Sequence, residues 1–163
     1  AYVGDGNNVA HSLLLATSLM GMNFRIASPA GYNVREDILA QAQDYAADTE
    51  AEIVCTERPQ EAVKGADIVY TDVWTSMGQE AESETRRQVF AGYQIDEALL
   101  ALAKDDAIFM HDLPAHRGEE VAEGIIDHPQ SVVFDQAENR LHIQKALLLR
   151  MLGGLEVSSN SLR

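Results

Sequence analysis

The sequence is poor in cysteine and in basic residues. Cys55 is the single cysteine among 163 residues, so the chain cannot form an internal disulfide or a multi-cysteine metal site. Lys and Arg number 12 against 26 Asp and Glu, which gives a formal net charge of −14. Because binding to a phosphate backbone needs clustered cations, no DNA or RNA partner is expected. The lone cysteine fits a reducing, cytoplasmic compartment.

Long apolar runs are also missing. The longest stretch without Asp, Glu, Lys or Arg, residues 6–24, is interrupted by asparagine, histidine, serine and threonine, so no membrane span is expected, and 46% of the residues are apolar, as in globular proteins. The length supports a single domain over residues 1–163. Residues Ala1 to Asp5 have no basic leader and resemble the middle of a strand, so we expect a missing segment upstream.

Short apolar runs alternate with helical patterns along the whole chain, which is typical of βαβ units. We therefore predict an α/β, three-layer, Rossmann-like domain with a mainly parallel central sheet and helices on both faces. Strands are predicted at Tyr2–Val3, Phe24–Ala27, Ile53–Cys55, Ile68–Thr71, Ala107–Met110 and Val132–Phe134. Helices are predicted at Asn8–Met20, Glu36–Ala47, a short segment after Pro59, Arg86–Ala91, Asp96–Ala103, Glu119–Gly124 and Glu138–Leu152.

Polar clusters follow several of these strands, and open parallel sheets bind ligands beyond the carboxyl ends of their strands. We therefore expect the clusters to meet at one edge of the sheet. The long polar stretch Trp74–Glu84 is typical of a functional loop. In the last cluster, Arg140 either binds an anion or pairs with Glu138 or Glu119. The four clusters are Asp5–Asn8, Asp72–Gly78, His111–Arg117 and Asp135–Arg140.

The segment Gly4–Val9 begins like a dinucleotide-binding fingerprint. Val9 occupies the position of the third glycine, and Ala27–Pro29 lacks the acidic residue expected about 20 positions later. A nicotinamide cofactor is therefore not expected. A tight turn in which Asn7 or Asn8 caps the next helix explains the pattern as well, and it leaves one carboxamide for a ligand.

The segment Asp72–Gly78 combines an acid, hydroxyl groups and a glycine. A carboxylate beside a hydroxyl suits an ammonium group, and free backbone N–H groups near Gly78 suit a carboxylate. Together they would hold the two α-groups of a free amino acid. A capped turn that leads into the next helix is the simpler alternative.

The cluster His111–Arg117 contains two imidazoles, a carboxylate and a guanidinium. No serine or cysteine nucleophile lies within it, which argues against a catalytic triad but leaves the distant Ser76 open. The spacing of His111 and His116 matches no common zinc pattern, so no metal is expected.

Taken in order, the motifs resemble those of the ornithine carbamoyltransferase family, and the resemblance covers essentially the whole chain. It points to the carboxyl-terminal, ornithine-binding half. It implies carbamoyl transfer from carbamoyl phosphate to the δ-amine of L-ornithine, giving L-citrulline and phosphate, a step of arginine biosynthesis. No cofactor is implied, and the full-length protein would be a homotrimer. The motifs are Gly4–Ser12, Asp72–Gly78, His111–Val121 and Phe134–His142.

The resemblance also implies roles for single residues. Asn8 and the backbone of Met77 would bind the ornithine carboxylate, and Asp72 and Ser76 would hold its α-amino group. The segment from Ser76 to Gly78 would close over ornithine. Carbamoyl phosphate would contact Arg140 and the backbone carbonyls of the His111–Pro114 loop, including that of Leu113.

This chain departs from the family at Asp112, where the family has cysteine. With Asp72 and Arg140, Asp112 completes the predicted catalytic set. A carboxylate there would stabilise the ornithine δ-ammonium and raise its pKa, and because the neutral amine is the nucleophile, slower chemistry is expected.

The amino-terminal carbamoyl-phosphate domain has no counterpart in this sequence. The isolated chain is therefore expected to bind ornithine weakly and to be inactive, with apolar surface exposed on its leucine-rich last helix. Two alternatives stay open. One is a carbamoyltransferase for another amine, such as putrescine or an acylated ornithine, and the other is a non-catalytic Rossmann-like binding module.

Overall fold

Five parallel strands form the centre of the molecule. The computed structural model describes residues 1–76 and 78–153, and its sheet has the order β3-β2-β1-β4-β5. Every strand pairing in these ranges is parallel, so the predicted α/β class and parallel sheet are confirmed. The strands are β1 Tyr2–Val3, β2 Phe24–Ala27, β3 Ile53–Thr56, β4 Ile68–Thr71 and β5 Ile108–His111.

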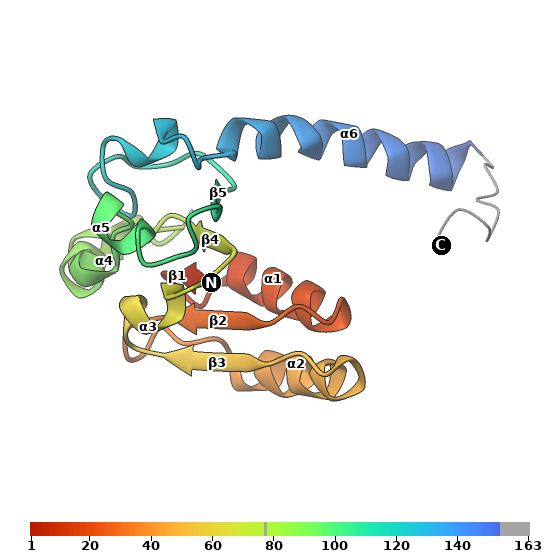
Figure 1. The fold of residues 1–163 in the computed structure, drawn as a ribbon, viewed down its shortest axis with the longest axis horizontal. Coiled ribbons are helices and arrows are strands. Elements are labelled where there is room, and N and C mark those ends of the chain that lie inside the picture. Colours follow the sequence, from red (N-terminus) through yellow and green to blue (C-terminus); the bar gives the residue numbers. More distant parts are fainter. Residues whose placement is uncertain (77, 154–163) are drawn as a thin grey trace.

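Helices cover both faces of the sheet (Figure 1). Helices α1 and α2 lie on one side, and α3, α4 and α5 lie on the other. The helices are α1 Asn8–Leu19, α2 Glu36–Thr49, α3 Pro59–Val63, α4 Ser83–Phe90, α5 Glu97–Leu100 and α6 Val133–Leu152, with short 3-10 turns η1 Glu80–Glu82, η2 Ala91–Tyr93 and η3 Ile125–Asp127.

Two apolar cores hold these layers together, because successive strand residues point to opposite faces of a sheet. In β1, Tyr2 joins the core under α1, whereas Val3 joins the core on the other face. In β4, Tyr70 likewise joins the core under α1, and Val69 joins the core on the other face. The alternation explains why these short strands are buried on both faces.

The predicted sixth strand, Val132–Phe134, is wrong. Ser131 makes a single parallel bridge to Phe109, and the chain then enters α6, in which Val133 is the buried first residue. An apolar run of three residues does not distinguish a strand from the buried first turn of a helix. The α6 helix therefore begins five residues earlier than predicted, at Val133 instead of Glu138.

The helix predicted at Glu119–Gly124 is also absent from the described residues. The chain instead forms a turn and a parallel bridge between Ile95 and Val121. The backbone N–H of Ile95 donates to the carbonyl of Glu120 at 2.8 Å. This pairing with a segment distant in sequence replaces the local helical hydrogen bonds.

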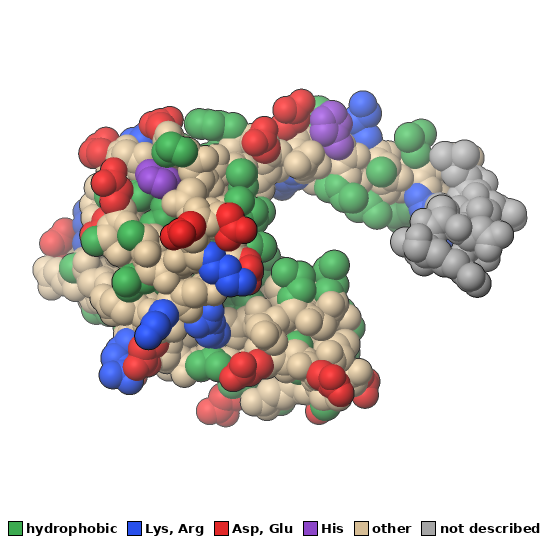
Figure 2. All heavy atoms as spheres, viewed as in Figure 1, with side chains coloured by type: hydrophobic (Ala, Val, Ile, Leu, Met, Phe, Trp, Pro, Cys, Tyr) green, Lys and Arg blue, Asp and Glu red, His purple; other side chains and the backbone are tan. Residues whose placement is uncertain are grey.

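The last helix, α6, leaves the body of the molecule (Figure 1). Figure 2 shows apolar side chains along the side of α6 that faces a hollow, with α1 across it. The expected exposure of apolar surface is confirmed, and within the described ranges no helix is both long and apolar enough to cross a bilayer. The large exposed apolar residues of α6 are Phe134, Leu141, Ile143, Leu147, Leu148, Leu149, Met151 and Leu152.

The turn after β1 is fixed by close contact with the loop that follows β2. A Cβ added to Gly6 would lie 2.3 Å from the backbone nitrogen of Val34, so no side chain fits there. The N–H of Gly6 donates to the carbonyl of Tyr32 at 2.8 Å. Gly6 therefore does more than form a tight turn, since it lets two loops meet beside the carboxyl end of β1.

Candidate functional site

The strand order creates a switch point between β1 and β4. The chain runs from β1 outward to β2 and β3, then returns to β4 on the other side of β1. Ligands of open α/β sheets bind at such a point, beyond the carboxyl ends of the strands. Asp5–Asn8 follow β1, Asp72 follows β4, and Asp112 follows β5. Three of the four predicted clusters therefore meet at one edge.

Asn7 joins the ends of β1 and β4. Its Oδ1 accepts hydrogen bonds from the N–H groups of Val9 at 3.0 Å and Ala10 at 3.3 Å, so Asn7 is the cap of α1. Its Nδ2 donates to Oδ2 of Asp72 at 3.0 Å. Asn8 follows with an exposed side chain, so its carboxamide is accessible to a ligand.

Asp72 and Asp112 place two carboxyl groups at the ends of β4 and β5. Asp72 is buried, and its Oδ1 accepts from the N–H of Val73 at 2.7 Å. Asp112 is half-buried, and its Oδ1 has no hydrogen-bond partner within the described ranges. Burial, together with the nearby negative charge of Asp72, raises the pKa of Asp112 to about 6. This edge is therefore suited to bind a cation.

The ring of His111 organises the loop after β5. Nδ1 of His111 accepts from the N–H of Leu113 at 2.8 Å. Because a backbone N–H only donates, this nitrogen carries no proton, and the proton of the neutral ring is on Nε2. Nε2 lies 3.3 Å from Oε1 of Glu120. Leu113 has a φ of 57°, so the backbone of this loop turns through the left-handed region.

The loop after β4 only partly matches its prediction. Ser76 is half-buried, and its N–H donates to Oε1 of Gln79 at 3.1 Å. The N–H of Gly78 was expected to be free, but it donates a hydrogen bond to Oε1 of Glu80 at 2.9 Å. The acid two residues after Gly78 is the sequence signal for this bond. Met77 lies outside the described residues.

Arg86 is a residue of this edge that the sequence reasoning missed. Its buried Nη1 donates to Oδ2 of Asp5 at 2.7 Å and to the carbonyl of Trp74 at 2.9 Å. Its Nε lies 3.2 Å from Oε2 of Glu82, and the guanidinium stacks over the ring of Tyr32. The guanidinium thus ties the turn after β1 to the loop after β4.

Burial raises the pKa of Asp5, and the hydrogen bond and charge of Arg86 offset only part of that effect. The i, i+4 spacing of Glu82 and Arg86 is the signal that sequence reasoning could have used. The same spacing links Arg86 to the buried Phe90, which places an arginine on the apolar face of α4.

The fourth cluster reaches the site through α6. Gln136 accepts from the N–H of His111 at 3.0 Å and donates to the hydroxyl of Tyr70 at 2.9 Å. Arg140 lies one helical turn further along α6 and is exposed. In residues 1–76 and 78–153, no hydrogen bond or ion pair involves the side chain of Arg140.

The partners considered for Arg140 are bound elsewhere. The carboxylate of Glu119 accepts from Nε of Arg87 at 2.9 Å. Oε1 of Glu138 lies 3.5 Å from Nε2 of His142. Pairing of Arg140 with Glu119 or Glu138 is therefore not observed among the described residues.

Three potential metal ligands also meet at this edge. The ligand atoms of Asp72, His111 and Asp112 lie within 4.8 Å of one another. Both oxygens of Asp72 already accept hydrogen bonds, and Nδ1 of His111 accepts the N–H of Leu113. Most of these donor atoms are thus engaged within the chain, so the geometry favours a hydrogen-bonded network over a metal centre.

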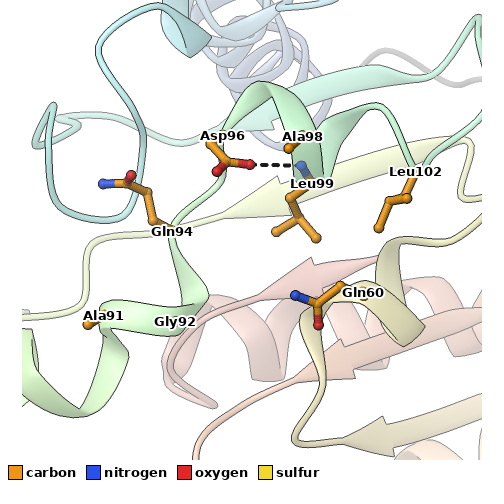
Figure 3. A pocket seen from close by; sticks show the side chains of 8 residues that line it. All are labelled: Gln60, Ala91, Gly92, Gln94, Asp96, Ala98, Leu99 and Leu102. Atoms are coloured by element: carbon orange, nitrogen blue, oxygen red, sulfur yellow. Dashed lines mark hydrogen bonds between the residues drawn. The ribbon is translucent and has the colours of Figure 1, made fainter.

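Two cavities of the described residues lie away from this edge. Figure 3 shows one of about 320 Å³, where the only drawn hydrogen bond is the cap from Leu99 N–H to Asp96 at 2.7 Å. A second, of about 810 Å³, lies near the amino ends of the strands and includes Phe24 and Ile68. Neither of these two cavities is lined by Asn8, Asp72 or Asp112.

A doubly wound parallel sheet with a polar switch point defines a Rossmann-like ligand-binding domain. Residues 1–151 match the family model described as "Aspartate/ornithine carbamoyltransferase, Asp/Orn binding domain". The chain belongs to this family.

Its relatives are similar along nearly the whole chain. It is 55% identical over 152 residues to an ornithine carbamoyltransferase of Anoxybacillus flavithermus, covering 93% of this chain and 48% of that protein. It is 53% identical over 156 residues to one of Thermococcus kodakarensis, covering 96% and 50%. The solved ornithine carbamoyltransferase of Pyrococcus furiosus is 52% identical, with a TM-score of 0.89 and coverage of 95% and 50%. The chain thus spans about half the length of the curated relatives it matches.

We expect Arg86→Ala to lower the free energy of unfolding by about 3–5 kcal/mol, because it leaves the buried carboxylate of Asp5 unpaired. Urea unfolding followed by circular dichroism measures the change. The control is Arg35→Ala, which breaks an exposed pair with Asp37 that solvent screens, so it should cost far less than Arg86→Ala. Equal losses in the two variants would contradict the importance of the buried pair.

We also expect Asp112 to make stability depend on pH. The pKa of Asp112 is raised in the folded state to about 6, so folding disfavours its ionised form. The wild type should lose stability, relative to Asp112→Asn, as the pH rises from about 4 to about 7, and the difference should then level off. Urea unfolding of both proteins across this range tests the sign. A difference that is independent of pH would show that the carboxyl is not perturbed by folding.

Proposed function

We propose that this chain is the ornithine-binding half of an ornithine carbamoyltransferase. The full-length protein would transfer the carbamoyl group of carbamoyl phosphate to the δ-amine of L-ornithine, giving L-citrulline and phosphate. The observation that carries the proposal is the carboxylate-lined switch point, where Asn7 holds Asp72. The names of the similar proteins support the same reaction.

The α-groups of ornithine would bind beside the start of α1. The amino end of this helix has no acidic residue in its first turn, so the helix dipole favours a carboxylate next to Asn8. Asp72 is held by Asn7 and by the N–H of Val73, and each of its oxygens keeps a second lone pair for an ammonium group. Ser76 and the backbone of Met77 complete the proposed set.

Carbamoyl phosphate would contact the carbonyl of Leu113 and the guanidinium of Arg140. The described half offers few cations for a phosphate, so most of the positive charge would come from a second, carbamoyl-phosphate-binding half. This arrangement is supported by the relatives, since the chain matches only about half of their length. The exposed apolar face of α6 is a surface that the proposed carbamoyl-phosphate-binding half would cover. We also propose a homotrimer for the full-length protein and a cytoplasmic location.

In the proposed reaction, the neutral δ-amine attacks the carbamoyl carbon. The new C–N bond forms as the bond from this carbon to the phosphate oxygen breaks, and the amine loses a proton. With a pKa of about 6, Asp112 carries a negative charge at neutral pH and stabilises the δ-ammonium form of ornithine. The fraction of reactive amine is then lower.

Asp112→Cys in the full-length protein should therefore raise kcat at neutral pH and move the rise of the pH–rate profile to lower pH. The physical reason is the loss of a carboxylate beside the δ-ammonium. Citrulline formation at saturating substrates, measured across pH, tests this. An unchanged turnover in Asp112→Cys would count against the assigned role of Asp112.

Calorimetry with L-ornithine, carbamoyl phosphate and NAD tests the proposed function directly. We expect weak binding of L-ornithine to the 163-residue chain, a loss of at least about tenfold in affinity in Asp72→Asn, and no binding of NAD. The chain alone should form no citrulline, whereas the full-length protein should. Preference of the full-length protein for putrescine would indicate the alternative amine, and a failure to bind ornithine would overturn the proposal.

A further inference from the structure

A fully buried carboxylate, that of Glu120, lies behind the loop that runs from His111 to His116. Its side chain is 0% exposed, which is rare for a glutamate without a cationic partner. Within the described residues no lysine or arginine pairs with it. Its Oε2 has no hydrogen-bond partner and lies 3.9 Å from Nδ1 of His116. Because burying a carboxylate without such partners is unfavourable, we expect the contacts of its other oxygen, Oε1, to explain why Glu120 occupies this position.

That other oxygen, Oε1, contacts both ends of the loop. It accepts from the N–H of His116 at 2.6 Å and lies 3.3 Å from Nε2 of His111. One acceptor atom therefore fixes the distance between the first and last residues of the loop.

The contact with His111 continues into the loop itself. Since Nδ1 of His111 accepts the N–H of Leu113, the ring proton must be on Nε2, where it is donated to Glu120. An acceptor at Glu120 thus selects the tautomer that can hold Leu113. The same N–H belongs to the peptide unit between Asp112 and Leu113, so its orientation also affects where the Asp112 side chain starts.

Glu120 is itself held firmly. Its carbonyl accepts from the N–H of Ile95 at 2.8 Å, and the next residue, Val121, bridges to Ile95. The preceding residue, Glu119, accepts a hydrogen bond from Gln94 at 2.7 Å through its carbonyl. The acceptor is therefore supported by backbone pairing rather than by a flexible surface segment.

We propose that Glu120 is a positioning residue for carbamoyl transfer: through the His111 ring and the His116 N–H, it holds the Leu113 carbonyl in place for the carbamoyl group. This inference rests on the proposed function. Glu120 touches no substrate and acts only through the loop. Ornithine α-group recognition, at the ends of β1 and β4, does not depend on it.

Steady-state kinetics of the full-length protein test this role. Glu120→Ala should lower kcat/KM for carbamoyl phosphate by about 100-fold, because a small displacement of a group that positions the substrate has effects of that order. The KM for ornithine should change by less than about threefold. Glu120→Gln keeps a carbonyl oxygen for both bonds and should recover most of the loss, whereas Glu120→Asp, with its acceptor withdrawn by one methylene, should not. A merely structural role would lower the active fraction and leave both KM values unchanged.

A second readout does not depend on activity. Histidine 15N spectra of the 163-residue chain should show His111 with its proton on Nε2 in the wild type and in Glu120→Gln, and a mixture of tautomers in Glu120→Ala. Glu119→Gln is the matched control, because that neighbouring acid contacts Arg87 and should leave the His111 tautomer unchanged.

The outcomes separate this inference from the proposed function. A full-length wild type without carbamoyltransferase activity would overturn the function, while the tautomer would still report on Glu120. An unchanged His111 tautomer in Glu120→Ala would overturn the inference. If Glu120→Ala does not fold, Glu120→Asp and Glu120→Gln decide. Wild-type kinetics in Glu120→Asp together with a large loss in Glu120→Gln would show that charge matters rather than acceptor position, and would also overturn it.

Discussion

The hydrogen bond from Asn7 to Asp72 is the interaction on which the arrangement of this site depends. It spans the switch point of the sheet, where no backbone ladder continues beyond the strand ends. The same carboxamide caps α1 through its oxygen, so the start of that helix and the Asp72 carboxylate are fixed relative to each other. A ligand with an anionic and a cationic group could therefore place its anion at the start of α1 and its cation at the Asp72 carboxylate, the two groups that Asn7 connects.

Around this bond, the edge buries charged and polar groups at a cost in solvation that only specific partners offset. Asp5 has Arg86, and Asp72 has Asn7 and a backbone N–H. One buried oxygen of Asp112 has no hydrogen-bond partner among the described residues, and burial together with the negative charge of Asp72 raises the pKa of this carboxyl. A carboxylate close to the proposed chemistry is thus only partly satisfied by hydrogen bonds from the described residues.

The exposed apolar face of α6 agrees with the size of the chain relative to its relatives, because the chain spans about half of their length. This helix extends away from the body of the molecule (Figure 1). Gln136 links α6 to β5 and to Tyr70, so the position of the helix is connected to the loop that begins at His111. A second half seated against α6 would therefore contact an element that is already bonded to the candidate site.

The sequence by itself determined the parallel sheet, the first five strands and the three clusters that meet at its edge, because short apolar runs that alternate with helical patterns, and polar residues after strands, are local signals. The sixth strand failed because the three residues from Val132 to Phe134 fit either a strand or a helix start. Only the tertiary structure decided which groups meet: Arg86 with Asp5, Gly78 with Glu80, and His111 with Glu120. The first and last of these pairs are separated by 81 and 9 residues, and no periodic pattern encodes the fit of a hydrogen bond between them. Such contacts depend on how the loops pack after the sheet has formed.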